Sequence, residues 1–223
     1  NTFYNPANMK LFIVGDLDPD KLIETIKEAN NDDIDFSENI ERFMEKEPLE
    51  INESLIVDKY TVSMPMFYIG YKDEFVKREA RESLKLEIIT DMLFDIIFSE
   101  SGDLHQNLYN EGLIVGGISG GYLSQKDYAY AVASVASKDP REVKKRIDEY
   151  IENLKKTGID SYEFEINKKK KIGGFLKSFD SINYIANNFL NYMFRGINFL
   201  EYFEVLKEVE IEETETVNKE ETP

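Results

Sequence analysis

The side chains that most often carry metal-dependent chemistry are nearly absent from this sequence, which contains one histidine, His105, and no cysteine. The neighbouring Asp103, Gln106 and Glu111 do not complete a recognised metal-ligand spacing around it. A histidine-based zinc-hydrolase site needs more than one imidazole, so the chain cannot form such a site by itself. We expect His105 to be solvated or hydrogen-bonded at the start of a helix.

The glycine-rich sequence GGISGG at residues 116–121 has the residue types of a phosphate loop or a nucleophile motif. A phosphate loop would end in Gly-Lys-Ser/Thr and open a helix, and this sequence does neither. Ser119 could act as a hydrolase nucleophile only with a histidine within its reach, and none is expected there. Both kinds of site are therefore excluded.

Two interpretations remain for these glycines. Glycine within a strand often marks a bulge, or a place where another backbone approaches closely. The second possibility gives Gly116 and Gly117 a role in binding, because an extended peptide can pair along the edge of such a strand.

The charge balance excludes several classes of partner. Lys and Arg number 27 against 44 Asp and Glu, a formal net charge of −17. That charge opposes nucleic-acid binding, which requires basic residues to neutralise phosphates, and it is a poor match for anionic lipids. It either favours cationic peptides or simply keeps the protein soluble. The acidic sequence NDDID at residues 31–35 lacks the spacing of a calcium loop and is interpreted as a solvated segment.

Cysteine content and hydropathy indicate the compartment. The absence of cysteine fits a reducing environment. No apolar stretch approaches the roughly 20 residues that span a bilayer, and the first residues have no signal-peptide pattern. We expect a cytoplasmic protein with neither a nucleic-acid nor a membrane partner.

The first part of the chain is predicted to alternate strands and helices. Residues 9–15 form an apolar run closed by glycine, which predicts a buried strand. The Asp-Pro pair at residues 18–19 then begins a helix, because Asp caps the free N–H groups and Pro tolerates the first helical position. The other elements expected here are strands at residues 54–63 and 66–71 and a long buried helix at residues 74–99.

The second part is predicted to contain a hairpin and several helices. Strands at residues 113–119 and 128–137 are expected to pair antiparallel, because their connection is too short for a crossover helix. The Asp-Pro pair at residues 139–140 repeats the helix start of residues 18–19. Helices are expected at residues 104–109, 140–154, 161–179, 181–194 and 199–209.

This order mixes hairpins with helices, so the predicted class is α+β, with a mainly antiparallel sheet packed against helices. One domain is expected over residues 1–211, followed by a polar acidic tail at residues 212–223 with little to bury. The chain starts without Met and ends on a polar run. These features are typical of an excised domain, and we expect the rest of the parent protein to hold the chemistry.

The order of motifs resembles the pitrilysin/insulinase family of zinc metallopeptidases. The sequence YNPANMKLFIVGD at residues 4–16 is similar to the segment that closes the family's first domain. The sequence LYNEGL at residues 108–113 is similar to the family helix that ends in LREEGL, and residues 172–203 resemble its C-terminal helices. The resemblance covers nearly the whole chain and is closest to the paired insulinase-like proteins of Gram-positive bacteria.

The resemblance implies an α+β metallopeptidase-half domain related to ferredoxin-like folds. Two such halves close like a clamshell around an unfolded peptide, and the zinc motif His-x-x-Glu-His lies in the N-terminal half. This chain would be the non-catalytic C-terminal domain, which walls the chamber and binds substrate. The fragment itself would have no cofactor and no activity, while the parent protein would be a zinc metalloendopeptidase. The implied partners are the catalytic half of the same protein, a peptide and, as in the paired systems, a second subunit.

At two positions the sequence departs from the family pattern. Many members supply an Arg and a Tyr from the C-terminal half, and the matching positions here are Tyr109 and Val115. The resemblance then implies that this domain shapes and holds substrate, and that a paired subunit supplies the Arg and Tyr to a zinc-bearing subunit. The candidate substrate-binding residues are Tyr109, Val115, Gly116 and Gly117. The same departure also fits an alternative, a proteolytically inactive member that acts as a peptide-binding or assembly scaffold.

Overall fold

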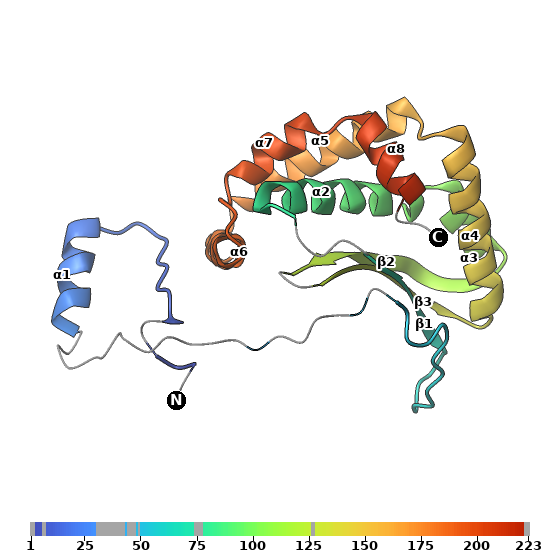
Figure 1. Cartoon of the computed structure of the whole chain (residues 1–223), viewed down its shortest axis with the longest axis horizontal. Helices are drawn as coiled ribbons and strands as arrows, with labels where there is room; N and C mark the ends of the chain where they lie inside the picture. Colours follow the sequence, from blue (N-terminus) through green and yellow to red (C-terminus); the bar gives the residue numbers. More distant parts are fainter. Residues whose placement is uncertain are drawn as a thin grey trace.

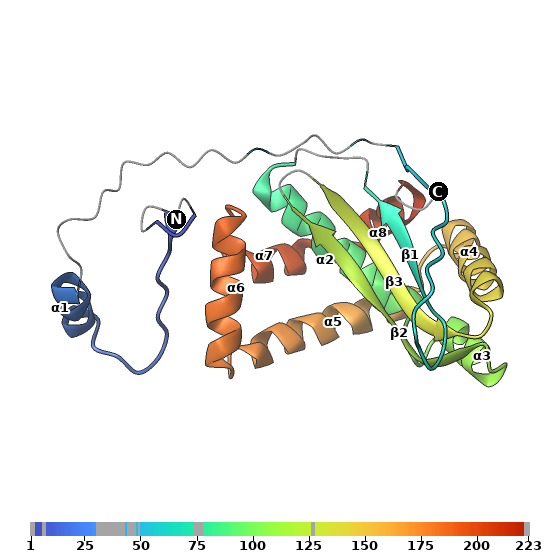
Figure 2. The same cartoon turned by 90° about the horizontal axis from the view of Figure 1, so that it is seen from below.

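Most of the molecule is a three-stranded sheet with helices packed on one of its faces (Figures 1 and 2). The computed structural model describes residues 3–5, 8–29, 43, 48, 50–73, 78–125 and 128–220. The strands are β1 (Met66–Lys72), β2 (Ile114–Ser124) and β3 (Ala129–Ser137). The helices are α1 (Pro19–Ala29), α2 (Ala80–Ile97), α3 (Asp103–Asn110), α4 (Pro140–Thr157), α5 (Ser161–Ser178), α6 (Ile182–Phe194), α7 (Glu201–Glu208) and α8 (Ile211–Glu220). The predicted α+β class is confirmed.

The sheet is antiparallel, with strand order β1-β3-β2. β2 and β3 form the predicted hairpin, although β2 continues through Gly120 and Gly121, beyond its predicted end at residue 119. Every second residue of β3 is buried towards the helices, beginning with Ala129. The central position of β3 leaves one edge of β2 without a strand partner in the described part of the chain.

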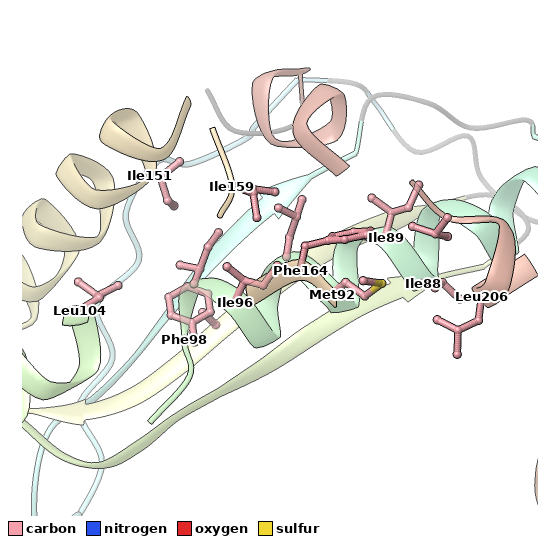
Figure 3. Close-up of a cluster of buried hydrophobic side chains, with 14 of the residues drawn as sticks. Ile88, Ile89, Met92, Ile96, Phe98, Leu104, Ile151, Ile159, Phe164 and Leu206 are labelled. Atoms are coloured by element: carbon pink, nitrogen blue, oxygen red, sulfur yellow. The ribbon is translucent and has the colours of Figure 1, made fainter. Parts of the chain in front are cut away.

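α2 is the central element of the core and confirms the predicted long buried helix. Leu84, Ile88 and Met92 are fully buried at intervals of four residues, so they form one continuous face. Figure 3 shows Met92 on α2 within a cluster that also includes Ile151 of α4 and Phe164 of α5. Full burial of each such side chain contributes roughly 1.5–3 kcal/mol to folding.

Aromatic rings fill the junction of α5, α6 and α7. Phe175 stacks on Tyr202 with ring centroids 4.9 Å apart, and Phe199 lies 5.6 Å from Phe175. Burial raises the pKa of the Tyr202 hydroxyl above its usual range. The C-terminal helices are therefore part of the core of the domain.

α8 occupies residues that we expected to form a polar tail. Thr214 is fully buried, and Val217 packs against the core cluster. Lys85 on α2 binds Glu213 at 2.5 Å. Partial burial raises the pKa of that carboxyl group, but the hydrogen bonds from Lys85 and from the Glu210 backbone N–H outweigh burial and lower it. Glu212 faces solvent, whereas Glu215 accepts from the backbone N–H of Ile159 at 3.1 Å. One side of this acidic helix is therefore packed on the domain, and composition alone did not show that side.

The N-terminal segment differs from the rest of the chain. α1 begins at the predicted position, where Asp18 Oδ1 accepts from the backbone N–H of Asp20 at 3.1 Å, but none of its residues is buried. Figures 1 and 2 show α1 at the end of the molecule away from the sheet. Phe12 makes a contact with the body of the domain, since its ring stacks on Phe189 of α6 at 4.2 Å.

The strands predicted at residues 9–15 and 54–63 are wrong, because both segments are irregular. Leu11 is 70% exposed and Val57 is 76% exposed, so neither segment lies in a core. A strand forms only beside a partner that takes its hydrogen bonds, and no described strand of this chain lies beside them. Residues 30–42, which include the NDDID sequence, lie outside the described residues, as do residues 74–77 at the predicted start of α2.

Among the described residues, no helix combines the length and apolar character needed to cross a bilayer.

Candidate functional site

The four candidate residues from the sequence lie together where α3 turns into β2. Tyr109 is in the last turn of α3 and Val115 is the second residue of β2, and each is 54% exposed. The turn between them is tight because Gly112, with φ of 70°, lets its own N–H bond to the Tyr109 carbonyl at 3.0 Å. The structure therefore gathers the candidates on one accessible corner.

A wide bulge interrupts β2 directly after Val115. Val115 pairs with Ala136 and Ser119 pairs with Ser134, so residues 116–118 of β2 face a single residue of β3. Gly116 has φ of 75°, a left-handed conformation that glycine adopts without strain. The bulge interpretation of the glycine-rich sequence is thus confirmed for its first half.

The second half of the sequence shows close backbone approach. A Cβ atom on Gly120 would lie 2.0 Å from the Val132 carbonyl oxygen and 3.0 Å from the Phe94 ring. A Cβ atom on Gly117 would meet only the Glu100 carboxylate, at 2.6 Å, which is the end of a flexible side chain. Gly120 is therefore required by packing within the domain, whereas Gly117 lies at an accessible position.

A groove of about 430 Å³ runs between the end of α2 and the bulged half of β2. Phe94 and Phe98 line it from the α2 side, Ile118 from β2, and Lys170 from α5. β2 lines the groove with Ile118 and Gly120, and it is an edge strand among the described strands. An extended chain placed there would find a backbone edge on one side and aromatic side chains on the other.

Asp91 marks where this open edge ends. Its Oδ1 accepts a hydrogen bond from the backbone N–H of Tyr122 at 3.3 Å, so one outward N–H of β2 is already occupied. Burial raises the pKa of the Asp91 carboxyl group, although the Lys171 ammonium opposes that change. The sequence around Asp91 contains no signal for this role, because the role depends on α2 lying beside the strand.

A buried carboxylate, Asp73, connects the end of β1 to β2. The Asp73 side chain is 5% exposed, and it accepts from Arg78 Nη1 at 2.6 Å and from the Tyr122 hydroxyl at 2.5 Å. The three residues are up to 49 positions apart in the sequence, so their spacing carried no signal. The pairing neutralises a charge that would otherwise be costly to bury.

Metal ligands do not converge at this corner. In the part of the chain that the structure describes, no group of three His, Cys, Asp or Glu side chains is placed to hold a metal ion. His105 donates towards the Gly116 carbonyl and is buried. The described residues at this corner therefore do not fit a catalytic zinc.

The sequence matches a family model over most of its length. Residues 1–171 match the model described as "Peptidase M16 inactive domain". The chain is also 28% identical over 224 residues to a Bacillus subtilis (strain 168) protein named "Uncharacterized zinc protease YmfH", an alignment that covers 99% of this chain and 51% of that protein. The chain thus spans about half the length of this curated relative.

Solved structures share the fold. An M16-like peptidase from Alicyclobacillus acidocaldarius superposes with a TM-score of 0.82 at 24% identity, covering 92% of this chain and 49% of that one. A protease from Helicobacter pylori gives a TM-score of 0.77 at 19% identity, covering 93% and 50%. In both, this fold makes up about half of a longer chain.

Proposed function

The chain belongs to the peptidase M16 family as an inactive domain, and from this membership we propose that it is the substrate-chamber domain of a zinc-dependent peptidase. The family membership agrees with the pitrilysin/insulinase resemblance of the sequence. In this proposal the zinc lies in another part of the parent protein, and this domain binds and orients peptides that are degraded or processed there. No step of the reaction is carried by a residue of this chain.

The proposal rests on the open edge of β2, meaning residues 116–120 on the side that has no strand partner among the described residues. Residues 116–120 lie beside a groove with phenylalanine side chains, and the bulge places them next to the exposed Tyr109 and Val115. Backbone pairing along an edge binds extended peptides without regard to most side chains. That property suits a chamber that accepts unfolded peptides.

The preceding catalytic half is the proposed partner of the N-terminal segment. Large apolar side chains are exposed along residues 3–62, with Leu11, Ile23 and Val57 as examples. A soluble monomer rarely leaves so many together, so the segment fits a surface that another domain covers. The relatives, which are about twice as long as this chain, contain enough residues for such a domain.

Tyr109 and Val115 also bear on how the site is completed. Neither position carries a guanidinium, and the isopropyl group of Val115 has no hydrogen-bond donor, so the two residues do not reproduce the Arg and Tyr pair that would stabilise negative charge near a zinc ion. We therefore propose that a paired subunit supplies these groups and that the present domain belongs to the zinc-bearing subunit. A parent sequence without His-x-x-Glu-His upstream of this chain would contradict that assignment.

The first test is zinc content and peptidase activity of the parent protein, alone and mixed with its paired subunit. One equivalent of zinc and hydrolysis of an unstructured fluorogenic peptide are expected for the parent or the pair, and neither for the 223-residue chain. The alternative function, a peptide-binding or assembly scaffold, is favoured by the residues at positions 109 and 115. It predicts peptide binding without zinc or hydrolysis in the parent protein and in the pair.

The second test places the peptide on β2. Gly117→Val adds a side chain at the open edge without left-handed strain, so we expect the KM for a peptide to rise by about tenfold while kcat is unchanged. Gly173→Ala on α5 is the matched control, because a Cβ atom there has nothing within 4 Å. Unchanged KM in Gly117→Val would remove this edge from the peptide path.

A further inference from the structure

His105, the single histidine of the chain, is buried beneath the bulge of β2. It is 7% exposed and lies in the first half of α3. Its ring stacks on Tyr109, one helical turn later, with centroids 5.9 Å apart and ring planes 13° from parallel. The imidazole therefore fills the space between α3 and the strand that carries the candidate edge.

One hydrogen bond fixes the tautomer of this ring. Nε2 of His105 lies 3.1 Å from the carbonyl oxygen of Gly116. A carbonyl oxygen can only accept, so Nε2 carries the proton and donates. The neutral ring then has a bare Nδ1, and that atom is buried with no hydrogen-bond partner among the described residues. The single directional bond of the imidazole is thus directed at the bulge.

Gly116 needs such an anchor. It is the first residue of the bulge and has φ of 75°, and glycine populates both this region and negative φ without steric cost, so its own geometry does not fix the conformation. The residues that follow it face a single residue of β3, so the ladder of β3 does not fix them all. A donor from α3 restrains the peptide unit that sets the direction of residues 117–120.

We propose that His105 is a positioning residue, which holds the Gly116 carbonyl and thereby sets the shape of the bulge and the direction of the open edge of β2. That the edge then receives a peptide rests on the proposed function. His105 is covered by the strand and does not itself touch the peptide. It acts through the backbone that it holds.

The tautomer is the first experimental test. Because the chain has one histidine, ¹⁵N-histidine labelling of the 223-residue chain gives one pair of ring nitrogen signals. We expect Nε2 to have the shift of a protonated nitrogen and Nδ1 that of an unprotonated one near neutral pH. The reverse tautomer would remove the donor to Gly116 and overturn the proposal.

Two variants test the anchor itself. Gln places an amide N–H near the position of Nε2, whereas Phe keeps the ring and removes the donor. In His105→Phe we expect hydrogen exchange at residues 116–119 to become roughly three- to tenfold faster, with exchange in α2 unchanged. His105→Gln should restore slow exchange. Equal exchange in His105→Phe and the original chain would refute the positioning role and leave the proposed function untouched.

Peptide kinetics of the active parent assembly separate the positioning role of His105 from the proposed binding of peptide along β2. His105→Phe should raise KM several-fold with kcat unchanged, and His105→Gln should recover most of the original KM. Faster exchange at the bulge with an unchanged KM would support the anchor and contradict the peptide path along β2.

Discussion

Helices α1 and α4 begin with the same Asp-Pro pair, but α4 is packed into the core and α1 is not. Asp139 Oδ1 accepts from the backbone N–H of Glu142 at 3.1 Å, and Asp18 Oδ1 accepts from that of Asp20 at the same distance. Each helix also has a clear apolar stripe. On α4 the stripe is buried, with Ile147 only 1% exposed, while α1 buries no residue.

The difference shows that capping and amphipathicity define a helix but do not provide the surface that it packs on. α4 follows β3 directly and packs beside α3 and β1. α1 lies in the segment before β1, where exposed apolar side chains are the rule. The stripe on α1 therefore predicts a partner surface, and the proposed catalytic half is the partner that we infer.

The largest expected contrast comes from truncating one isoleucine in each helix. Ile147→Ala removes fully buried methyl groups and should lower the free energy of unfolding of the chain by about 2–5 kcal/mol. Ile23→Ala, on the 48% exposed Ile23 of α1, should change it by less than about 0.5 kcal/mol. Denaturant unfolding followed by circular dichroism measures both. A large effect at Ile23 in this chain alone would mean that α1 already has its partner.

Substitutions of glycine should show the same contrast between the packed sheet and the N-terminal segment. Gly120→Ala would place a methyl group against the Val132 carbonyl, so we expect a loss of about 1–3 kcal/mol from the strain of overpacking. Gly15→Ala in the N-terminal segment meets only Leu17, at 3.8 Å, and should be neutral. Thermal unfolding of the two variants compares them directly. A tolerated Gly120→Ala would show that β2 and β3 can separate at this point.

The two caps should have unequal effects on global stability. Asp139→Ala should cost about 1 kcal/mol, because α4 unfolds together with the core. Asp18→Ala should reduce helix content without changing the main unfolding midpoint, because α1 packs on nothing in the core. Comparison of the far-ultraviolet signal with tyrosine fluorescence separates the two kinds of change. Equal midpoint shifts would contradict the distinction between the helices.

The smallest expected effect concerns the charge of Asp91, a carboxylate of α2 whose pKa is raised by burial. Burial raises the pKa of Asp91, so the folded state favours its neutral form. This contribution to stability is fully present below the ordinary pKa of about 4 and is lost as pH rises through the raised value. Asp91→Asn keeps an acceptor for Tyr122 and removes the charge. Its stability relative to the original chain should therefore rise as pH increases from about 4, as measured by denaturant unfolding at several pH values.

Much of the fold followed from local pattern. The long helix α2, the hairpin of β2 and β3 and the Asp-Pro helix starts were predicted within a few residues, because periodicity and caps act over short distances. The strands predicted at residues 9–15 and 54–63 were wrong for a related reason. Their apolar composition describes a segment that needs a partner, and the sequence does not say whether this chain contains that partner.

The candidate site was predicted in part. Gly116 and Gly117 were chosen from their sequence, and Tyr109 and Val115 from the family resemblance, and the structure brings all four to one corner. His105 was expected to be solvated or hydrogen-bonded, and it is hydrogen-bonded to the bulge. Asp91 lies 31 residues before Tyr122. A contact between a helix and a distant strand edge produces no periodic pattern in the sequence, so Asp91 could not be predicted.

The sequence by itself determined that this chain lacks the ligands of a histidine-based zinc site, because residue types do not depend on folding. It also determined the class of fold, since helix and strand patterns are local. Only the tertiary structure decided that the single imidazole holds a left-handed glycine, that α8 is packed on the core, and that one edge of β2 has no strand partner among the described residues. Those features depend on which segments meet in space, and that outcome is set by packing of the whole chain.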